Sequence, residues 1–185
     1  GFKNFEYLFT TNDAYIITRN TILYNLAFII LGLVIAVGFA IMLSELVNKR
    51  TAKVYQTGMF LPHFLSWVII SYFAFTFLSV DKGTLNQIIT YFGGEPISWY
   101  SEAKYWPFIL VFVGIWKGVG YNSVIYLAAI TGIDKSYYEA TVIDGASKWK
   151  QVRYITIPLL KPLMIILTIL AIGGIFRSDF GLFYQ

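Results

Sequence analysis

The sequence contains no cysteine and a single histidine, His63. Without cysteine there is no disulfide framework, no thiolate zinc site and no cysteine nucleophile. One histidine also argues against a metal centre built from imidazoles. We therefore expect no metal site in this chain.

Charge is scarce as well. Charged residues make up 13% of the 185 residues, where a soluble domain usually carries about 25%. Hydrophobic residues reach 57% and aromatic residues 19%, and the mean hydropathy is +0.65. So few charges cannot cover the surface of a water-soluble globule this apolar. The composition excludes a disordered chain, a nucleic-acid-binding module and most soluble enzymes, and it indicates a protein whose solvent is lipid.

Long apolar runs predict the membrane spans. A bilayer core about 30 Å thick requires about 20 mainly apolar helical residues. Four runs meet this requirement, and the last of them opens at Pro158. In the second run, Pro62 marks either a kink or the first turn of the helix. The sequence therefore predicts an all-α membrane protein with four transmembrane helices in this chain. The spans are residues 22–43, 54–80, 105–133 and 157–180.

Basic residues predict the orientation, because Lys and Arg collect on the cytoplasmic side of a membrane. Segments 44–54 and 134–161 together carry eight of them, whereas segments 1–19 and 81–104 carry four. We therefore expect the loops after the first and third spans in the cytoplasm. An aromatic belt is expected at the outer interface. Its members would include Trp99, Tyr100, Tyr105 and Trp106.

The loop after the third span carries strong local signals. Ser136 is followed three residues later by Glu139, a capping-box pattern that predicts a short helix beginning at Ser136. The pair Asp144-Gly145 predicts the turn that ends this helix. Ser147 can cap a second helix. The loop is therefore expected to form two short helices, separated by a turn at the glycine, that lie at the membrane surface.

The same loop resembles a known family signature. It reads Glu139-Ala140-Thr141, three residues, Gly145, nine residues, then Ile155-Thr156-Ile157-Pro158. This is similar to the EAA signature of binding-protein-dependent ABC importer permeases, which is Glu-Ala-Ala, three residues, Gly, nine residues, Ile-x-Leu-Pro. Thr141 and Ile157 are the two departures. Shorter stretches also look like sugar-type permeases of this family, at residues 2–5, 19–21, 60–62, 83–86, 115–118 and 126–129.

The resemblance implies an architecture and a set of partners. It implies a type I ABC importer transmembrane domain, with residues 1–185 an incomplete part, at both ends, of a six-helix subunit. Two permease subunits, identical or homologous, would form the pathway. ABC ATPase subunits would lie beneath them, and an extracellular solute-binding protein would deliver cargo. The protein would be a multi-pass component of the bacterial cytoplasmic membrane, in contact with lipid and with no nucleic acid partner.

The resemblance also implies a role for residues 134–158, the EAA coupling loop. Its short helix, residues 138–145, would dock into a cleft of the ATPase, with Glu139 facing a basic group and Gly145 permitting the turn. Glu139 as a simple capping acid remains compatible with this role. The chain has no G-x-x-x-x-G-K-[ST] phosphate loop, so we expect a transporter subunit that is not an enzyme and binds no cofactor, with ATP and Mg at the partner ATPase. The expected coupling residues are Tyr138, Glu139, Ala140, Asp144, Gly145, Ile155 and Pro158.

Polar side chains near the spans are candidates for the substrate path. An ionisable residue inside a membrane is costly and usually functional, which draws attention to Lys117. Its alternative role is packing against backbone carbonyls. Arg177 and Asp179 are expected on the outer end of the last helix, where an interfacial anchor is the alternative. The candidates are Trp116, Lys117, Tyr121, Asn122, Arg177 and Asp179.

The predicted function is carbohydrate import. The ending at residues 175–184 is similar to a subgroup linked to polysaccharide uptake, including uronic-acid-containing sugars. A permease for another small solute, such as a polyol or glycerol phosphate, is the alternative within transport. A non-transporting membrane structural protein is the alternative from another class, although it has no reason to carry the EAA spacing. A membrane enzyme is disfavoured, because the spans hold no carboxylate pair, metal cluster or nucleophile constellation.

Overall fold

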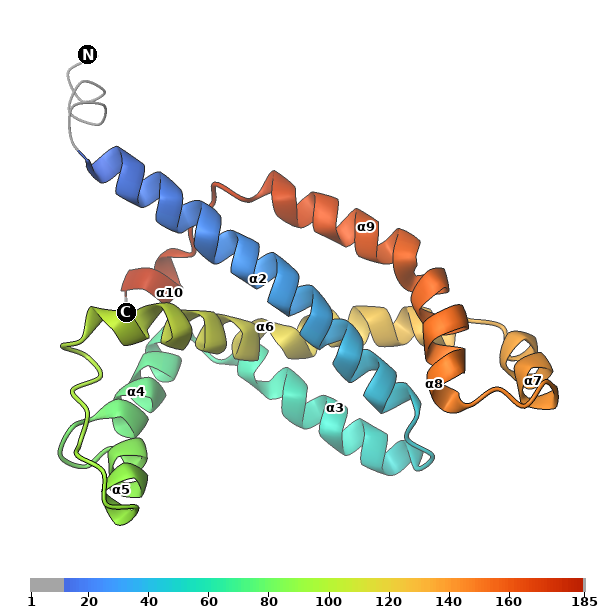
Figure 1. The fold of residues 1–185 in the computed structure, drawn as a ribbon, viewed down its shortest axis with the longest axis horizontal. Helices are drawn as coiled ribbons and strands as arrows, with labels where there is room; N and C mark the ends of the chain where they lie inside the picture. The colour runs from blue at the N-terminus through green and yellow to red at the C-terminus, as the bar shows by residue number, and fades with distance from the viewer. Residues whose placement is uncertain (1–11, 185) are drawn as a thin grey trace.

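The structure, a computed structural model, describes residues 12–184 and contains helices without any strand in that range (Figure 1). The stretch at 2–5 that resembles the family lies outside the described residues. Three helical segments are long and apolar enough to cross a membrane, and a bent pair makes a fourth candidate. The prediction of an all-α membrane protein is thus confirmed. The segments are α2 (Asp13–Ser44), the pair α3 (Lys49–Phe64) and α4 (Trp67–Leu78), η1 (Ala103–Tyr105) with α6 (Trp106–Thr131), and α8 (Lys148–Gln151), η2 (Val152–Thr156) and α9 (Ile157–Gly173) in succession.

Helix α6 is the centre of the packing (Figure 1). Helix α2 lies along it, α3 packs against it, and α9 contacts both α2 and α6. Ala36 and Ala40 of α2 are fully buried, and such small residues let helices approach closely. At Gly120 the approach is closer still, because an added Cβ would lie 1.9 Å from the Met59 carbonyl oxygen of α3. The core residues are Ala36, Val37, Ala40, Val119, Tyr126, Ile130 and Leu160.

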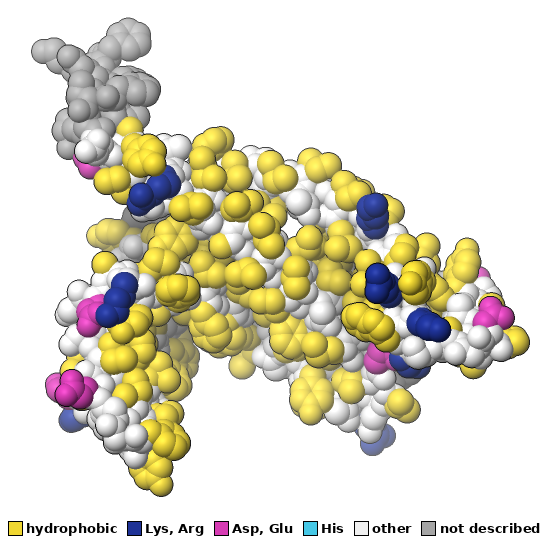
Figure 2. Space-filling model, viewed as in Figure 1, with side chains coloured by type: hydrophobic (Ala, Val, Ile, Leu, Met, Phe, Trp, Pro, Cys, Tyr) yellow, Lys and Arg dark blue, Asp and Glu magenta, His cyan; other side chains and the backbone are white. Residues whose placement is uncertain are grey.

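The surface matches a membrane environment. Hydrophobic side chains cover the middle of the visible face, over α2, α6 and α9, while charged side chains gather toward the two ends (Figure 2). The coupling loop and the loop between α4 and α6 lie at these opposite ends (Figure 1). An apolar band between two charged ends is what a bilayer core flanked by water requires.

The second span departs from the prediction of one helix. The axes of α3 and α4 differ by 103°. Buried Pro62 lies in the last turn of α3 and cannot donate a backbone hydrogen bond. Leu65 is extended, and the Ser66 hydroxyl accepts the Ile69 N–H at 3.3 Å, which starts a new helix. The interpretation of Pro62 as a kink is therefore confirmed, whereas its interpretation as the first turn of the second span is wrong.

The fourth span also differs from the prediction. The helix runs from Lys148 to Gly173 and gains its length at the start. Residues 174–179 then form an irregular connection to α10 (Phe180–Tyr184). The paired glycines at 173 and 174 are poor helix formers. The placement of Arg177 and Asp179 on the last helix is therefore wrong, because both lie in this connection.

The outer loop is organised by one buried side chain. Asn86 of α5 (Thr84–Tyr91) is 2% exposed. Its Nδ2 donates to the Ser79, Val80 and Ile97 carbonyls at 3.4, 3.2 and 2.9 Å. Its Oδ1 accepts the Ile97 N–H and the Trp99 Nε1–H, both at 3.0 Å. The amide therefore joins both ends of the loop to α5.

Replacement of Asn86 with alanine should unfold this loop. The Ile97 N–H and the Trp99 indole N–H would lose their acceptor, and an unpaired buried donor costs about 1–3 kcal/mol. We expect the free energy of unfolding of this loop to fall by about 2 kcal/mol or more. Residues 79–102 should then be cleaved faster by protease in the detergent-solubilised subunit. The matched control is Gln87→Ala, since the exposed Gln87 side chain makes one hydrogen bond to the described residues, from Nε2 to the Lys82 carbonyl at 3.2 Å. Equal protease resistance of Asn86→Ala and Gln87→Ala would contradict the assignment.

Candidate functional site

The short helix of the coupling loop is α7 (Lys135–Ile143). Asp134 has extended backbone angles, and its Oδ1 accepts the Ser136 N–H at 2.9 Å. A helix beginning at Ser136 with a Ser136–Glu139 capping box is therefore wrong, because the Asp134 carboxylate already caps the helix. This hydrogen bond lowers the pKa of the Asp134 carboxyl. The cap is therefore present at neutral pH and is lost only as the pH falls through that lowered pKa.

The end of α7 is a complete Schellman motif. Gly145 has φ +71°, in the left-handed region. The Ala146 N–H donates to the Thr141 carbonyl at 2.9 Å, and the Gly145 N–H donates to the Val142 carbonyl at 3.1 Å. The predicted turn at Asp144-Gly145 is therefore present. Ser147 follows as the cap of α8, as predicted, with its hydroxyl accepting the Lys150 N–H at 3.5 Å.

The end of the signature lies on a widened helix. A π-helical turn, η2, joins α8 to α9 and ends at Thr156, two residues before Pro158. Pro158 has no N–H to donate, and a wider turn accommodates the missing bond. Pro158 lies in the first turn of α9 as predicted, yet the helix continues through it from α8. The end of the coupling loop thus continues into a membrane-spanning helix without a break in the helix.

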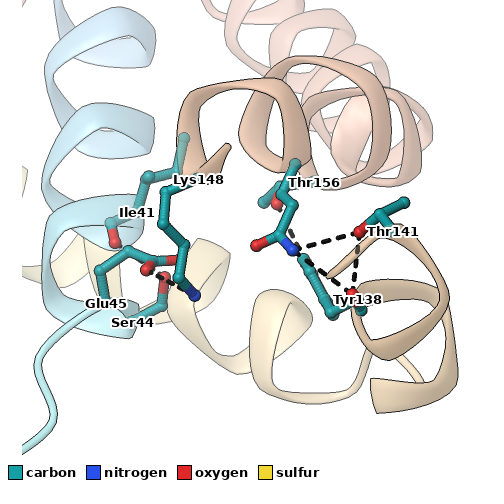
Figure 3. A network of polar contacts seen from close by, with 8 residues as sticks. Ile41, Ser44, Glu45, Tyr138, Thr141, Lys148 and Thr156 are labelled. Carbon is teal, nitrogen blue, oxygen red and sulfur yellow. Dashed lines mark hydrogen bonds and ion pairs between the residues drawn. The ribbon is translucent and has the colours of Figure 1, made fainter. Parts of the chain in front are cut away.

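Polar contacts attach α7 to this helix (Figure 3). Gln151 Nε2 donates to the Tyr138 carbonyl at 3.3 Å and to Thr141 Oγ1 at 3.1 Å. The Tyr138 hydroxyl lies 3.0 Å from Thr156 Oγ1. These two residues, Gln151 and Thr156, were not predicted from the sequence. The available signal was their position within the signature, because Gln151 lies among the nine residues after Gly145 and Thr156 fills the variable place in Ile-x-Leu-Pro.

An ion pair links the loop to α2. Lys148 Nζ lies 3.1 Å from a Glu45 carboxylate oxygen (Figure 3). Both side chains are substantially exposed, at 74% and 40%, and such pairs contribute little stability. The sequence analysis also missed this pair, which brings together residues far apart in the chain.

The remaining expected coupling residues divide between two environments. Glu139, Ala140 and Asp144 are exposed, whereas Tyr138 and Ile155 are half-buried. No described residue of α7 is buried, and Val142 and Ile143 are 64% and 87% exposed. The helix lies at one end of the molecule (Figure 1), and its exposed side chains include both apolar and acidic ones. Such a surface can receive a protein partner, and the docking role of these residues stays a prediction.

Lys117 lies at the break in the second span. Its ammonium donates to the carbonyls of Pro62, at 3.4 Å, His63, at 3.0 Å, and Leu65. It also lies 5.2 Å from the centre of the Trp67 ring, a cation–π distance. The last carbonyls of a helix have no partner within the helix and carry partial negative charge. Lys117 thus packs against backbone carbonyls, and a contact with substrate stays a prediction.

The other candidates for the substrate path lie in separate places. Tyr121 stacks on the His63 ring at 4.9 Å between ring centres. Asn122 and Asp179 line one small cavity of about 190 Å³, next to Trp67. Trp116 lies instead on two apolar grooves of about 760 and 800 Å³.

The connection after α9 is held by its own polar contacts. Asp179 Oδ1 accepts the N–H groups of Gly181 and Leu182 at 2.9 and 3.4 Å and caps α10. The Arg177 carbonyl accepts a hydrogen bond from Asn25 of α2 at 3.3 Å. The structure therefore brings Asn122 and Asp179 together and does not unite all six candidates in one site.

Comparison with known proteins identifies the family. Residues 28–178 match the model of the binding-protein-dependent transport system inner membrane component. The chain belongs to this family. The resemblance carried by the EAA spacing is thus confirmed, and so is a multi-pass component of the inner membrane.

Individual relatives of this family agree with the match. The polygalacturonan/rhamnogalacturonan transport system permease protein YteP of Bacillus subtilis (strain 168) is 34% identical over 180 residues, covering 97% of this chain and 56% of the relative. A crystal structure of a bacterial ABC transporter involved in the import of the acidic polysaccharide alginate is 31% identical. It covers 100% of this chain and 66% of that chain, with a TM-score of 0.93. A structure of the bacterial alginate ABC transporter with an alginate pentasaccharide-bound periplasmic protein has a TM-score of 0.91, 31% identity, and coverage of 100% and 65%.

These matches establish the fold and show how much of each relative the chain covers. The predicted fold, an ABC importer transmembrane domain, is confirmed by the structural match over the whole chain. The family model describes a transport system component of the inner membrane, and the similar protein YteP is named as a transport system permease. The chain spans just over half the length of the curated relatives it matches.

Proposed function

We propose that the chain is the membrane-spanning part of an ATP-driven, binding-protein-dependent importer of carbohydrate. The observation that carries this proposal is α7, a capped helix closed by left-handed Gly145 and exposed at one end of an importer fold. An exposed helix that is separated from a membrane-spanning helix by one short turn is suited to transmit a partner's movement. Family membership supports the same function.

The cargo we propose is an oligosaccharide that contains uronic acids. The names of two similar proteins support it, because polygalacturonan and alginate are both acidic polysaccharides. The ending at residues 175–184 supports the same subgroup. A neutral sugar, a polyol or glycerol phosphate would be the cargo under the alternative.

The proposed partners follow from the two ends of the molecule. We propose that ABC ATPase subunits, with their ATP and Mg, dock on α7 from the cytoplasm. A second permease subunit would complete the pathway within the membrane. A solute-binding protein would dock on the outer side, near the loop that Asn86 organises, and the similar transporter solved with a periplasmic protein supports this partner.

The test is uptake by the complete transporter in proteoliposomes. The full-length subunit and its partner subunits would be supplied with internal ATP and external binding protein. We expect ATP-dependent accumulation of labelled oligogalacturonate, with less accumulation of a neutral oligosaccharide of equal length. Accumulation of glycerol phosphate or a polyol alone would overturn the cargo, and no ATP-dependent uptake of any of these solutes would overturn the function.

The proposed topology predicts which residues a membrane-impermeant thiol reagent reaches. Lys150→Cys should react only from the cytoplasmic side, and Lys82→Cys only from outside. Both side chains are exposed, and these 185 residues contain no native cysteine to compete. Labelling in intact cells and in inverted vesicles measures the two sides. Reaction of Lys150→Cys in intact cells would reverse the orientation derived from the basic residues.

A further inference from the structure

Helix α7 is attached to the rest of the molecule chiefly by polar contacts. None of its described residues is buried, so little apolar area fixes its position. The side chains that meet it from the α8–α9 helix are instead buried, with Gln151 2% exposed and Thr156 3% exposed. The contacts are those of Gln151 with Tyr138 and Thr141, and of Thr156 with Tyr138 (Figure 3).

Gln151 is an unfavourable choice for packing alone. Its Oε1 is buried without a hydrogen-bond partner among the described residues. A buried polar atom without a partner opposes folding, whereas an apolar side chain of similar size would fill the same place without that cost. What the amide adds is its Nε2, which makes two hydrogen bonds to α7. Its presence is explained if holding α7 in one orientation matters.

Thr141 is matched to this amide. The EAA signature has alanine at this place, and alanine would leave Nε2 with the Tyr138 carbonyl alone. The Thr141 hydroxyl accepts Nε2 at 3.1 Å while donating to the Tyr138 carbonyl at 2.8 Å. The departure from the signature therefore has a partner ten residues along the chain.

The anchor points lie where they affect the membrane span. Gln151 ends α8, and Thr156 ends the π turn η2 that leads into α9. Both belong to the continuous helix that extends to Gly173. A force on α7 that passes through these contacts reaches the span directly and bypasses the turn at Gly145.

We propose that Gln151 and Thr141 are positioning residues that, with the Tyr138–Thr156 contact, form a rigid joint between α7 and the α8–α9 helix. This inference rests on the proposed function, since it assigns the joint to the transmission of ATPase movement into the membrane. Gln151 and Thr141 act through α7 and need not touch the ATPase themselves.

The test uses the full-length subunit assembled with its partners in nanodiscs. Spin labels at Tyr137→Cys on α7 and Lys161→Cys on α9, both exposed and outside the joint, report the distance distribution between the two helices. A second measurement gives the number of sugar molecules imported per ATP hydrolysed. Affinity of the ATPase for the permease serves as a third readout, which a positioning role should leave within about twofold.

Gln151→Leu and Thr141→Ala should each broaden the distance distribution and lower the sugar-to-ATP ratio threefold or more. Thr141→Ser keeps the hydroxyl and should behave as the parent. The double variant should be no worse than Gln151→Leu, because both changes remove one shared interaction. Thr141→Ala replaces the residue with the one in the signature, so it carries the test if Gln151→Leu does not assemble.

A parental distance distribution and ratio in Thr141→Ala would overturn the joint. A parental distance distribution in Thr141→Ala together with a lower affinity for the ATPase would assign Thr141 to docking. That result would also overturn the joint. If the parent itself imports no sugar, the proposed function fails. The distance measurement then still decides whether the joint exists, because it requires no transport.

Discussion

Replacement of Gly145 with proline should lower ATP-coupled uptake by at least about tenfold, while the subunit still inserts into the membrane. Gly145 has φ +71°, and the proline ring fixes φ near −65°. Proline also removes the N–H that donates to the Val142 carbonyl. The Schellman motif cannot then form, and the face of α7 would be turned away from its docking position. A tenfold change corresponds to about 1.4 kcal/mol in the limiting step.

A matched variant separates the effect of the backbone conformation at Gly145 from the effect of adding a side chain there. An added Cβ at Gly145 would meet nothing within 4 Å, so a side chain fits if the backbone permits it. Asparagine tolerates the left-handed region better than other residues with a side chain. Gly145→Asn should therefore retain most of the uptake that Gly145→Pro loses. Uptake and the stimulation of ATPase activity by loaded binding protein are measured together, and parental values for Gly145→Pro would remove the turn from the mechanism.

Replacement of Lys117 with methionine should reduce uptake of acidic and neutral oligosaccharides alike, by about tenfold or more. Methionine has similar length and is apolar, so membrane insertion is retained or improved. The carbonyls of Pro62, His63 and Leu65 would lose their cationic donor. A hydrogen bond to a charged group contributes about 1.5–3 kcal/mol, so the break between α3 and α4 should lose its fixed geometry.

The comparison between cargoes decides the role of Lys117. Loss for the acidic cargo alone would place the ammonium in the substrate path and would contradict a role in holding the carbonyls at the break between α3 and α4. Lys117→Arg keeps the charge and the donors and is the matched control, with uptake expected nearer to the parent. Unchanged uptake of both cargoes by Lys117→Met would exclude both roles.

Features determined by nearby residues could be predicted from the sequence. The first and third spans follow from long apolar runs, which are uncharged in the first and interrupted only by Lys117 in the third, and they correspond to α2 and α6. The turn at Gly145 and the cap at Ser147 depend on residues within one helical turn. The one local error, at Ser136, arose because two potential caps compete two residues apart and Asp134 takes the N–H.

Features determined by distant residues could not be predicted. Pro62 marks a kink, but the bend of 103° also involves Lys117 on another helix. Gln151 lies between charged and apolar neighbours, a pattern that predicts a surface position. Its burial depends on α7 folding back against α8. The cavity beside Asn122 and Asp179 requires four helices to converge. Sequence patterns therefore locate the coupling loop but not the contacts that hold it.

The bend in the second span also has a consequence for biosynthesis. Leu65 and Lys117 are 52 positions apart, so a ribosome adding about 5–20 residues per second completes Lys117 roughly 3–10 s after Leu65. Helix α4, with 12 residues, is about 18 Å long and cannot cross a bilayer core of about 30 Å by itself. The second span therefore lacks its contacts with Lys117 until the third span has entered the membrane. The second span acquires its final shape only after α6 has been synthesised.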